Sequence, residues 1–365
     1  MNTTLSLIPY FKQSPPIIQL AWFLSIVFFI LIIILTVTLK YFRIHLRRNE
    51  KFIKFQSESE TFIISYIYAE LEGVNCSPEQ ELIVNDVKKN TTDAYKRDVF
   101  IATLLKLRKE ISGEMAAVIQ KLYFQTEISN YTISNLKSKK WYILAKSIRE
   151  LSQLRIEEVH DEVIVNLNHP RKEVRKETQL YLVNLFYFKG LDFLDDERTQ
   201  VSEWDQIQIL EALQGFNDKQ SFDIIKWLNS PNDSVVDFAL KIAKIYNQFE
   251  AKDKLLELLN HTNKSIRVKV IDVLSHLYVI EANDLLKNNF NELSIDEQIA
   301  FFKMLEKTFD TNDESFLLEQ INHKNFEIKF STLSILKKLK NNIFKNFDNE
   351  TLDHDSIRII KFLNN

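Results

Sequence analysis

The chain has 365 residues, with 47 basic and 50 acidic side chains and a formal net charge of −3. Because charges of both signs are interleaved, the sequence lacks the basic stripe of a nucleic-acid-binding groove, and no nucleic-acid partner is expected. The chain has only four glycines, so no Gly-rich nucleotide-binding loop can be written, and its single cysteine excludes an intramolecular disulfide.

The N-terminal region contains a long uncharged stretch. After a short segment at residues 1–16, the run at residues 17–39 has no charged side chain. At about 1.5 Å per residue, a helix over this run can cross a hydrocarbon layer of about 30 Å. A buried core helix would keep a polar face, and a cleaved signal peptide would have a shorter apolar region. We therefore predict a single transmembrane helix at residues 17–39.

Basic residues are distributed unequally around this stretch. Only Lys12 precedes it, whereas six basic residues follow it closely: Lys40, Arg43, Arg47, Arg48, Lys51 and Lys54. Because basic flanks stay in the cytoplasm, we predict a single-pass protein of the cytoplasmic (inner) membrane, with residues 1–16 outside. The six residues would also attract anionic lipid headgroups, but a purely topological role is the preferred interpretation.

Residues 40–98 are predicted to form a basic juxtamembrane flank and a helical stalk. The apolar spacing stays helical to Leu71, Pro78 suits the first position of a new helix, and residues 90–93 form another break. A repeat array is expected over residues 99–365.

Within this array a phrase of Leu or Ile, then Asn, then His or Ser recurs at a fixed interval. Its asparagines are Asn168, Asn229, Asn260 and Asn322. Neighbouring asparagines in this set are either one or two repeat lengths of about 31 residues apart. Where they are two lengths apart, a degenerate copy of the repeat lies between them. Such a period is typical of stacked repeats, in which each unit buries its apolar side against its neighbours.

Each unit is predicted to contain two helices separated by the polar turn. After the turn, apolar or small residues fall at offsets 0, 4, 7, 8 and 11, which line one side of an α-helix. In four copies these predicted core residues are Val174, Thr178, Tyr181, Leu182 and Leu185; Val235, Ala239, Ile242, Ala243 and Tyr246; Ile266, Val270, Val273, Leu274 and Leu277; and Ile328, Thr332, Ile335, Leu336 and Leu339.

Less regular copies bring the expected total to about eight units. They are predicted at residues 201–216, at residues 293–308, at a truncated copy around residues 354–358, and at an early copy with its apolar side at Trp141, Ala145 and Ile148.

The turn resembles that of the HEAT repeat, whose second helix opens with a Val-Arg pair after an Asp-Pro turn. Val174-Arg175 and Ile266-Arg267 match the pair, Pro170 and Pro231 match the proline, and His or Ser replaces the family's turn Asp. The resemblance covers about two-thirds of the chain. It implies an all-α fold in which the transmembrane helix is followed by a HEAT-like α-solenoid, with the second helices along a concave face.

No catalytic, cofactor-binding or metal-binding residues are predicted. Histidines recur at the turns, but stacked helices lie about 8–10 Å apart, which is too far for shared zinc ligands at about 2.1 Å. The acidic runs near His160 and Asp195 are typical of solvated turns, and no Gly-x-Ser-x-Gly motif occurs. We therefore expect a protein that is not an enzyme and has no cofactor.

The second helices instead offer a basic surface with aromatic residues. These residues lie off the predicted core, so we expect them to face solvent and to bind an acidic segment of a protein partner; a solvated helix face is the alternative for each single residue. The candidate partner-binding residues are Arg175, Lys176, Lys241, Lys244, Arg267, Lys269, Phe302, Lys329, Phe330 and Lys337.

These features together predict a bacterial, membrane-anchored cytoplasmic scaffold or adaptor. It would bind a protein partner at the membrane surface, in a setting such as an envelope polysaccharide or secretion complex. Two alternatives remain open: a HEAT-fold enzyme of the DNA-base glycosylase or lyase type, and an extracytoplasmic array of inverted topology.

Overall fold

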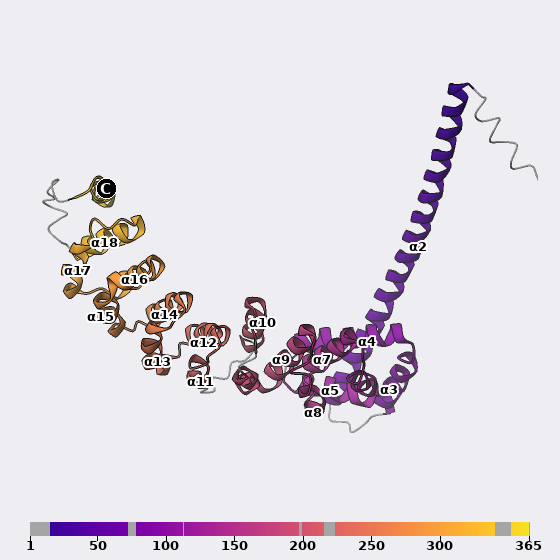
Figure 1. The fold of residues 1–365 in the computed structure, drawn as a ribbon. Coiled ribbons are helices and arrows are strands. Elements are labelled where there is room, and N and C mark those ends of the chain that lie inside the picture. Colours follow the sequence, from indigo (N-terminus) through magenta and orange to yellow (C-terminus); the bar gives the residue numbers. More distant parts are fainter. Residues whose placement is uncertain are drawn as a thin grey trace, which may run out of the picture. The chain divides into compact units, whose positions relative to one another are not determined.

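The computed structural model describes residues 15–71, 78–111, 113–196, 199–214, 223–339 and 352–364. These residues form 18 α-helices and five 3-10 helices, and no strand occurs among them, so the predicted all-α class is confirmed (Figure 1). Contacts divide the chain into two compact units, Met1–Ile156 and Glu157–Asn365, and each is described by itself.

The first unit is built on one long helix, α2 (Pro16–Leu71), of 56 residues (Figure 1). Its N-terminal part contains the uncharged run at residues 17–39, whose large apolar side chains are mostly exposed. This helix is long and apolar enough to cross a membrane, as the sequence predicts in outline. Lys12, with the rest of residues 1–14, and the side chain of Arg48 lie outside the described residues.

The C-terminal part of α2 belongs to the core of this unit. Ser59, Ile63, Tyr66 and Ile67 are buried, and α2 packs against α4 (Ala94–Glu110) and α5 (Glu114–Gln125). The Tyr66 hydroxyl donates a 2.6 Å hydrogen bond to the side chain of Gln125. The chain therefore passes from its exposed apolar run into a packed domain along a single unbroken helix.

Three further helices complete the first unit: α3 (Pro78–Asn90), α6 (Ile128–Asn135) and α7 (Trp141–Leu154). Asp93 caps α4 by accepting a 3.0 Å hydrogen bond from the backbone N–H of Lys96, in line with the predicted break.

The predicted boundary between residues 98 and 99 falls inside α4, which packs on both α2 and α7. A stalk and an array are therefore not separated at that point.

The second unit contains seven longer helices, here called the second helices: α9 (Lys172–Phe186), α10 (Glu203–Gln214), α12 (Asp233–Ile245), α14 (Lys264–His276), α16 (Ile295–Thr308), α18 (Phe326–Lys338) and α19 (His354–Asn364). Shorter elements between them are α8 (His160–Ile164), η1 (Tyr187–Asp195), α11 (Ile225–Leu228), η2 (Phe249–Ala251), α13 (Lys252–Glu257), η3 (Leu258–Asn260), α15 (Glu281–Asn288), η4 (Phe290–Glu292), η5 (Thr311–Asp313) and α17 (Glu314–Glu319). From α12 to α19, each second helix packs directly on the next (Figure 1).

The second helices begin at a constant interval. The N-cap residues of α9, α12, α14, α16 and α18 are Arg171, Asn232, Asn263, Ser294 and Asn325. From α12 to α18 these starts are about 31 residues apart, and α9 precedes α12 by a double step. The asparagine side chains accept hydrogen bonds from the backbone N–H two residues later, which satisfies a group that the helix leaves unpaired. The sequence period thus reflects equivalent helix starts.

The apolar stripe predicted for these helices forms their buried side. All twenty residues predicted for the four regular copies are buried except Tyr246 and Leu339, which are half-buried. In the degenerate copies, Ile209 and Leu213 are also buried, whereas Phe216 lies outside the described residues. Burying a large aliphatic side chain contributes about 1.5–3 kcal/mol, so this stripe is the main source of cohesion.

The register predicted for the early copy is wrong by two residues. Ala145 and Ile148 are buried as expected, but Trp141 is 38% exposed. The N-cap of α7 is Lys140, which lies one repeat length before Arg171, the N-cap of α9. This alignment places Glu150 at the core position that Tyr181 occupies in the next copy.

Candidate partner-binding surface

The turns before the second helices share one hydrogen-bonding pattern. Nδ1 of His169, His261 and His323 accepts a hydrogen bond of 3.0–3.1 Å from the backbone N–H two residues later. The hydroxyl of Ser230 accepts the equivalent bond at 3.2 Å. A ring whose Nδ1 accepts is assigned as the neutral Nε2–H tautomer, and burial lowers the pKa of His323 in agreement with this form. These histidines therefore serve as turn residues.

Two of the predicted partner-binding cations close these turns. The Arg175 guanidinium donates to the carbonyls of His169 at 2.8 Å and Pro170 at 3.1 Å. Arg267 donates to the carbonyl of His261 at 2.6 Å in the same way. Both side chains therefore hold their own repeat together.

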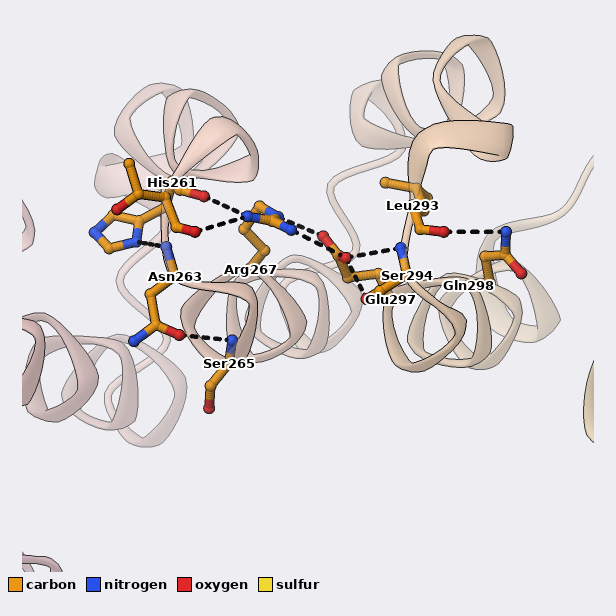
Figure 2. A network of polar contacts seen from close by, with 9 residues as sticks. His261, Asn263, Ser265, Arg267, Leu293, Ser294, Glu297 and Gln298 are labelled. Carbon is orange, nitrogen blue, oxygen red and sulfur yellow. Dashed lines mark hydrogen bonds and ion pairs between the residues drawn. The ribbon is translucent and has the colours of Figure 1, made fainter.

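Arg267 also joins its helix to the next one (Figure 2). Its guanidinium donates two hydrogen bonds, of 2.5 Å and 3.2 Å, to the carboxylate of Glu297 on α16. The side chain of Glu297 is only 1% exposed, and its carboxylate also accepts from the backbone N–H and hydroxyl of Ser294. Burial alone would raise the pKa of Glu297, but the hydrogen bonds from Arg267 and Ser294 outweigh it and hold the pKa below its usual value.

The other predicted cations are likewise engaged by neighbouring helices. Lys176 lies 3.9 Å from Asp205, Lys241 donates to Gln206 at 2.6 Å, Lys244 pairs with Asp272 at 2.5 Å, Lys269 pairs with Asp237, Lys329 pairs with Asp353, and Lys337 donates to the carbonyl of Leu363. An acidic partner would have to compete with these contacts, so the candidate cations mainly connect one repeat to the next.

Two candidate residues do not face solvent, and their prediction is wrong. Phe302 is 1% exposed because it lies on the inner side of α16, with its ring 5.8 Å from that of Phe290 and 6.0 Å from that of Phe316. Lys329 is 4% exposed because Asp353, just before α19, pairs with it. Hydrogen bonds from Lys329 and Ser356 outweigh the burial of Asp353 and lower its pKa to about 2.

No family model matches this chain. No curated protein corresponds to its sequence. Among solved structures, an engineered protein is similar at 13% identity, over 70% of this chain and 96% of that chain, with a TM-score of 0.22. A score this low carries no argument about fold or activity.

A groove of about 830 Å³ opens between α14 and α16. Val268, Ile299 and Ala300 give it apolar and small surface. Its charged lining residues are Lys264, Asp272, Asp296, Lys303, Glu306 and Lys307. Such a groove provides apolar contact with charged groups on both sides, which suits a protein segment.

An exposed aromatic cluster lies on α18 and α19. The ring centroid of Phe330 lies 6.2 Å from that of Phe326 and 6.5 Å from that of Phe362. Phe326 is 61% exposed and Phe362 is 69% exposed, while Phe330 between them is half-buried. Large aromatic side chains that are open to solvent and in mutual contact are typical of protein-binding surfaces.

The groove and the aromatic cluster share one structural position. Val268, Ile299 and Phe330 occupy the same position relative to the N-cap of their helices, one repeat apart in sequence. All three are half-buried. The sequence predictions include Phe330 but not Val268 or Ile299, because basic and aromatic residues are their only binding candidates off the core. An apolar residue that recurs at one off-core position in successive repeats is the signal that identifies them.

A smaller apolar pocket of about 490 Å³ lies beside His160. Leu182, Phe186 and Phe193 line it, and the His160 ring contacts Phe186 edge-on at 5.0 Å. Within the described residues, no group of three or more His, Cys, Asp or Glu side chains could hold a metal ion. Its lining also includes the charged residues Lys189, Asp192 and Asp196.

The first unit also contains a buried carboxyl group, that of Glu150. It is 6% exposed, with its carboxylate 3.7 Å from the Lys146 ammonium and 3.5 Å from the Thr132 hydroxyl. Lys146 makes its shorter contact, of 3.0 Å, with Asp98. Burial raises the pKa of Glu150 to about 7, and Lys146 opposes this shift only in part.

Proposed function

We propose that the chain is a membrane-anchored cytoplasmic scaffold, in which a HEAT-like solenoid binds a protein partner along its second helices. The observation that carries this proposal is the continuity of α2 (Pro16–Leu71), which begins with exposed apolar side chains and ends buried against α4 and α5. A bilayer would cover the exposed part, and the buried part would hold the folded region at the membrane surface.

The regular helix starts support the solenoid part of the proposal. Helices that begin at one fixed interval and pack each on the next, as from α12 to α18, match the one-dimensional stacking of repeat proteins. The HEAT family is proposed from the Val-Arg pairs and turn prolines. A place in an envelope polysaccharide or secretion complex is proposed by analogy alone.

The orientation is proposed from the basic residues that follow the apolar run, among them Lys40, Arg43 and Arg47, which are exposed. This cluster would also contact anionic lipid headgroups. The repeats would then lie in the cytoplasm, where the encounter with a partner is confined to the membrane surface.

Fusing reporters after Asn365 tests this topology. A reporter active only in the cytoplasm should be active, and one that requires the periplasm should be silent. A matched variant with Lys40, Arg43, Arg47, Arg48, Lys51 and Lys54 changed to Gln should lose this strict orientation, because the positive flank is removed. Periplasmic activity of the unchanged chain would overturn the cytoplasmic scaffold and favour the inverted topology.

A further inference from the structure

We propose that one side of α2, just beyond the proposed membrane span, is a docking surface for an acidic segment of a partner protein held beside the membrane. This inference rests on the proposed membrane crossing and cytoplasmic orientation, and it adds a second contact to the one proposed along the second helices. The surface, here called the basic stripe, consists of five cations: Lys40, Arg43, Arg47, Lys51 and Lys54.

The five cations lie on one side of the helix. Successive residues of an α-helix point about 100° apart, so the steps of three, four, four and three residues between these cations keep all five within a sector of about 80°. Every residue between positions 40 and 54 that falls in this sector is Lys or Arg. Glu50, the single acidic residue in this range, falls just outside it. A topological signal requires positive charges near the span, but it does not require them on one side.

The basic stripe faces away from the packed core of the first unit. The buried residues farther along α2, among them Ser59, Ile63 and Ile67, point more than about 100° away from the centre of the stripe. All five cations are exposed. Within the described residues only Lys54 forms an ion pair, a 4.0 Å contact with Glu58 in which the two side chains are 81% and 50% exposed. The stripe is therefore open to a partner.

Anionic lipids reach only the first part of the stripe. With the span ending at Leu39, the rise of about 1.5 Å per residue places Arg43 about 6 Å and Lys54 about 22 Å beyond the hydrocarbon layer. The headgroup layer is about 5–8 Å thick, and a helix tilt of about 20° shortens these heights by less than about a tenth. Lys51 and Lys54 therefore lie about 10 Å or more beyond the headgroups, farther than the screening length of about 8 Å. Because α2 is unbroken from Pro16 to Leu71, the stripe does not bend down onto the membrane.

An acidic protein segment fits the outer part of the stripe. Arg47, Lys51 and Lys54 are separated by about 6 Å and about 4.5 Å along the helix axis, and carboxylates four and three residues apart on a neighbouring helix have the same spacing. A pairing of this kind already occurs on α2, where Glu60 accepts a 2.7 Å hydrogen bond from Lys106 on α4. Complementary charges on exposed helices select a partner and speed its encounter, and salt weakens them.

Two synthetic helical peptides of equal length test the charge of the partner. The acidic peptide carries glutamates three and four residues apart on one side, and the neutral peptide carries glutamine at the same positions. Binding to the full chain in phosphatidylcholine nanodiscs is measured by fluorescence anisotropy at low salt. We expect the acidic peptide to bind at least about tenfold more tightly, and we expect high salt to remove the difference. Equal affinities at low salt would overturn the inference.

Substitutions on the protein locate the site. The stripe variant removes the three outer cations through Arg47→Gln, Lys51→Gln and Lys54→Gln. Its matched control removes the same charge from exposed cations elsewhere in the first unit through Lys89→Gln, Lys109→Gln and Lys139→Gln. The stripe variant should lose about tenfold in affinity for the acidic peptide and the control less than about twofold, both at unchanged melting temperature. Equal losses in the two variants, or no loss in the stripe variant, would contradict the proposed surface.

Fluorescence quenching tests the membrane as the alternative occupant. A label at Ser57→Cys, just beyond the stripe, is compared with one at Tyr41→Cys, close to the span, after Cys76→Ser removes the chain's single cysteine. The quencher is attached to lipid headgroups in nanodiscs that contain phosphatidylserine. We expect strong quenching at position 41 and little at position 57, because about 24 Å of helix separates them. Equal quenching at the two positions would assign the stripe to anionic lipid and overturn the inference.

The topology reporters separate this inference from the proposed scaffold function. A cytoplasmic signal together with equal affinity for the two peptides would reject the basic stripe and leave the scaffold in place. A periplasmic signal would reject the orientation on which both proposals rest.

Discussion

Each of the two units buries a glutamate beside a helix–helix contact, and the two carboxylates differ in the donors that surround them. Glu297 in the second unit meets the forked guanidinium of Arg267 and its own capping Ser294. Glu150 in the first unit has only longer contacts, of 3.5 Å and 3.7 Å, to Thr132 and Lys146. Both are nearly inaccessible to water, yet the pKa of Glu297 is lowered and that of Glu150 is raised to about 7. Burial therefore leaves a carboxylate charged only where well-aligned donors replace the lost water.

Removing the partner of Glu297 should cause the largest loss of unfolding free energy. Arg267→Ala leaves the carboxylate of Glu297 buried without its main donor, and we expect a loss of about 3–5 kcal/mol in unfolding free energy. This should match or exceed the loss of about 2–5 kcal/mol expected for Leu274→Ala, which removes a fully buried core side chain. Urea unfolding followed by circular dichroism measures both, and hydrogen exchange should show the loss around α14 and α16.

The double variant Arg267→Ala/Glu297→Ala serves as the control for that site. Removing both partners should recover part of the stability, because no uncompensated charge stays buried. A loss below about 1 kcal/mol for Arg267→Ala alone would mean that the pair contributes no more than an exposed ion pair.

A substitution at Glu150 should change the unfolding free energy by a smaller amount, and this change should depend on pH. Glutamate in an unfolded chain has a pKa of about 4.3, whereas burial raises that of Glu150 to about 7. Between these values the folded state holds a proton that the unfolded state lacks, so its contribution to stability falls as the pH rises. Glu150→Gln should therefore stabilise the first unit by about 1–3 kcal/mol at pH 8 and change little at pH 5.

Unfolding of Glu150→Gln and of the unchanged chain at the two pH values tests this expectation. Glu110, which is exposed on α4, provides a control through Glu110→Gln, which should show no such pH dependence. A variant that is less stable at pH 8 would mean that Lys146 pairs with the charged form of Glu150 more strongly than the 3.7 Å contact indicates.

The smallest effect is expected at the exposed pair of Lys244 and Asp272. Their side chains are 41% and 57% exposed, and their contact of 2.5 Å is screened by water. Lys244→Ala should change the unfolding free energy by no more than about 0.5 kcal/mol in the same urea experiment. A loss comparable to that of Arg267→Ala would show that the ion pairs between repeats act as one network.

The helical class, the repeat length and the buried stripe could be predicted because they depend on local periodicity. The apolar periodicity within a single helix is enough to predict Val174 or Ile266 as a core residue, and both are buried. The apolar run at residues 17–39 is likewise recognisable from length and composition alone.

The surface could be predicted only in part, because it depends on contacts between repeats. Nothing near Lys329 in sequence indicates that Asp353 will cover it, and Arg267 finds Glu297 on the following second helix. The register of α7 was missed because Glu150 occupies an apolar position, so a pattern of hydrophobic residues shifts towards Trp141 instead. Polar residues at core positions break the pattern on which such predictions depend.

The unbroken course of α2 couples position and orientation in a single element. A residue added between Lys40 and Lys54 would turn everything after it by about 100° around the helix axis and move it by about 1.5 Å. We propose that residues 17–39 lie in a bilayer. A membrane protein that contacts this segment would then also determine the rotation of the folded unit about the α2 axis. A rotation of the membrane segment would then be transmitted through α2 to the folded unit. A flexible linker would not transmit such a rotation.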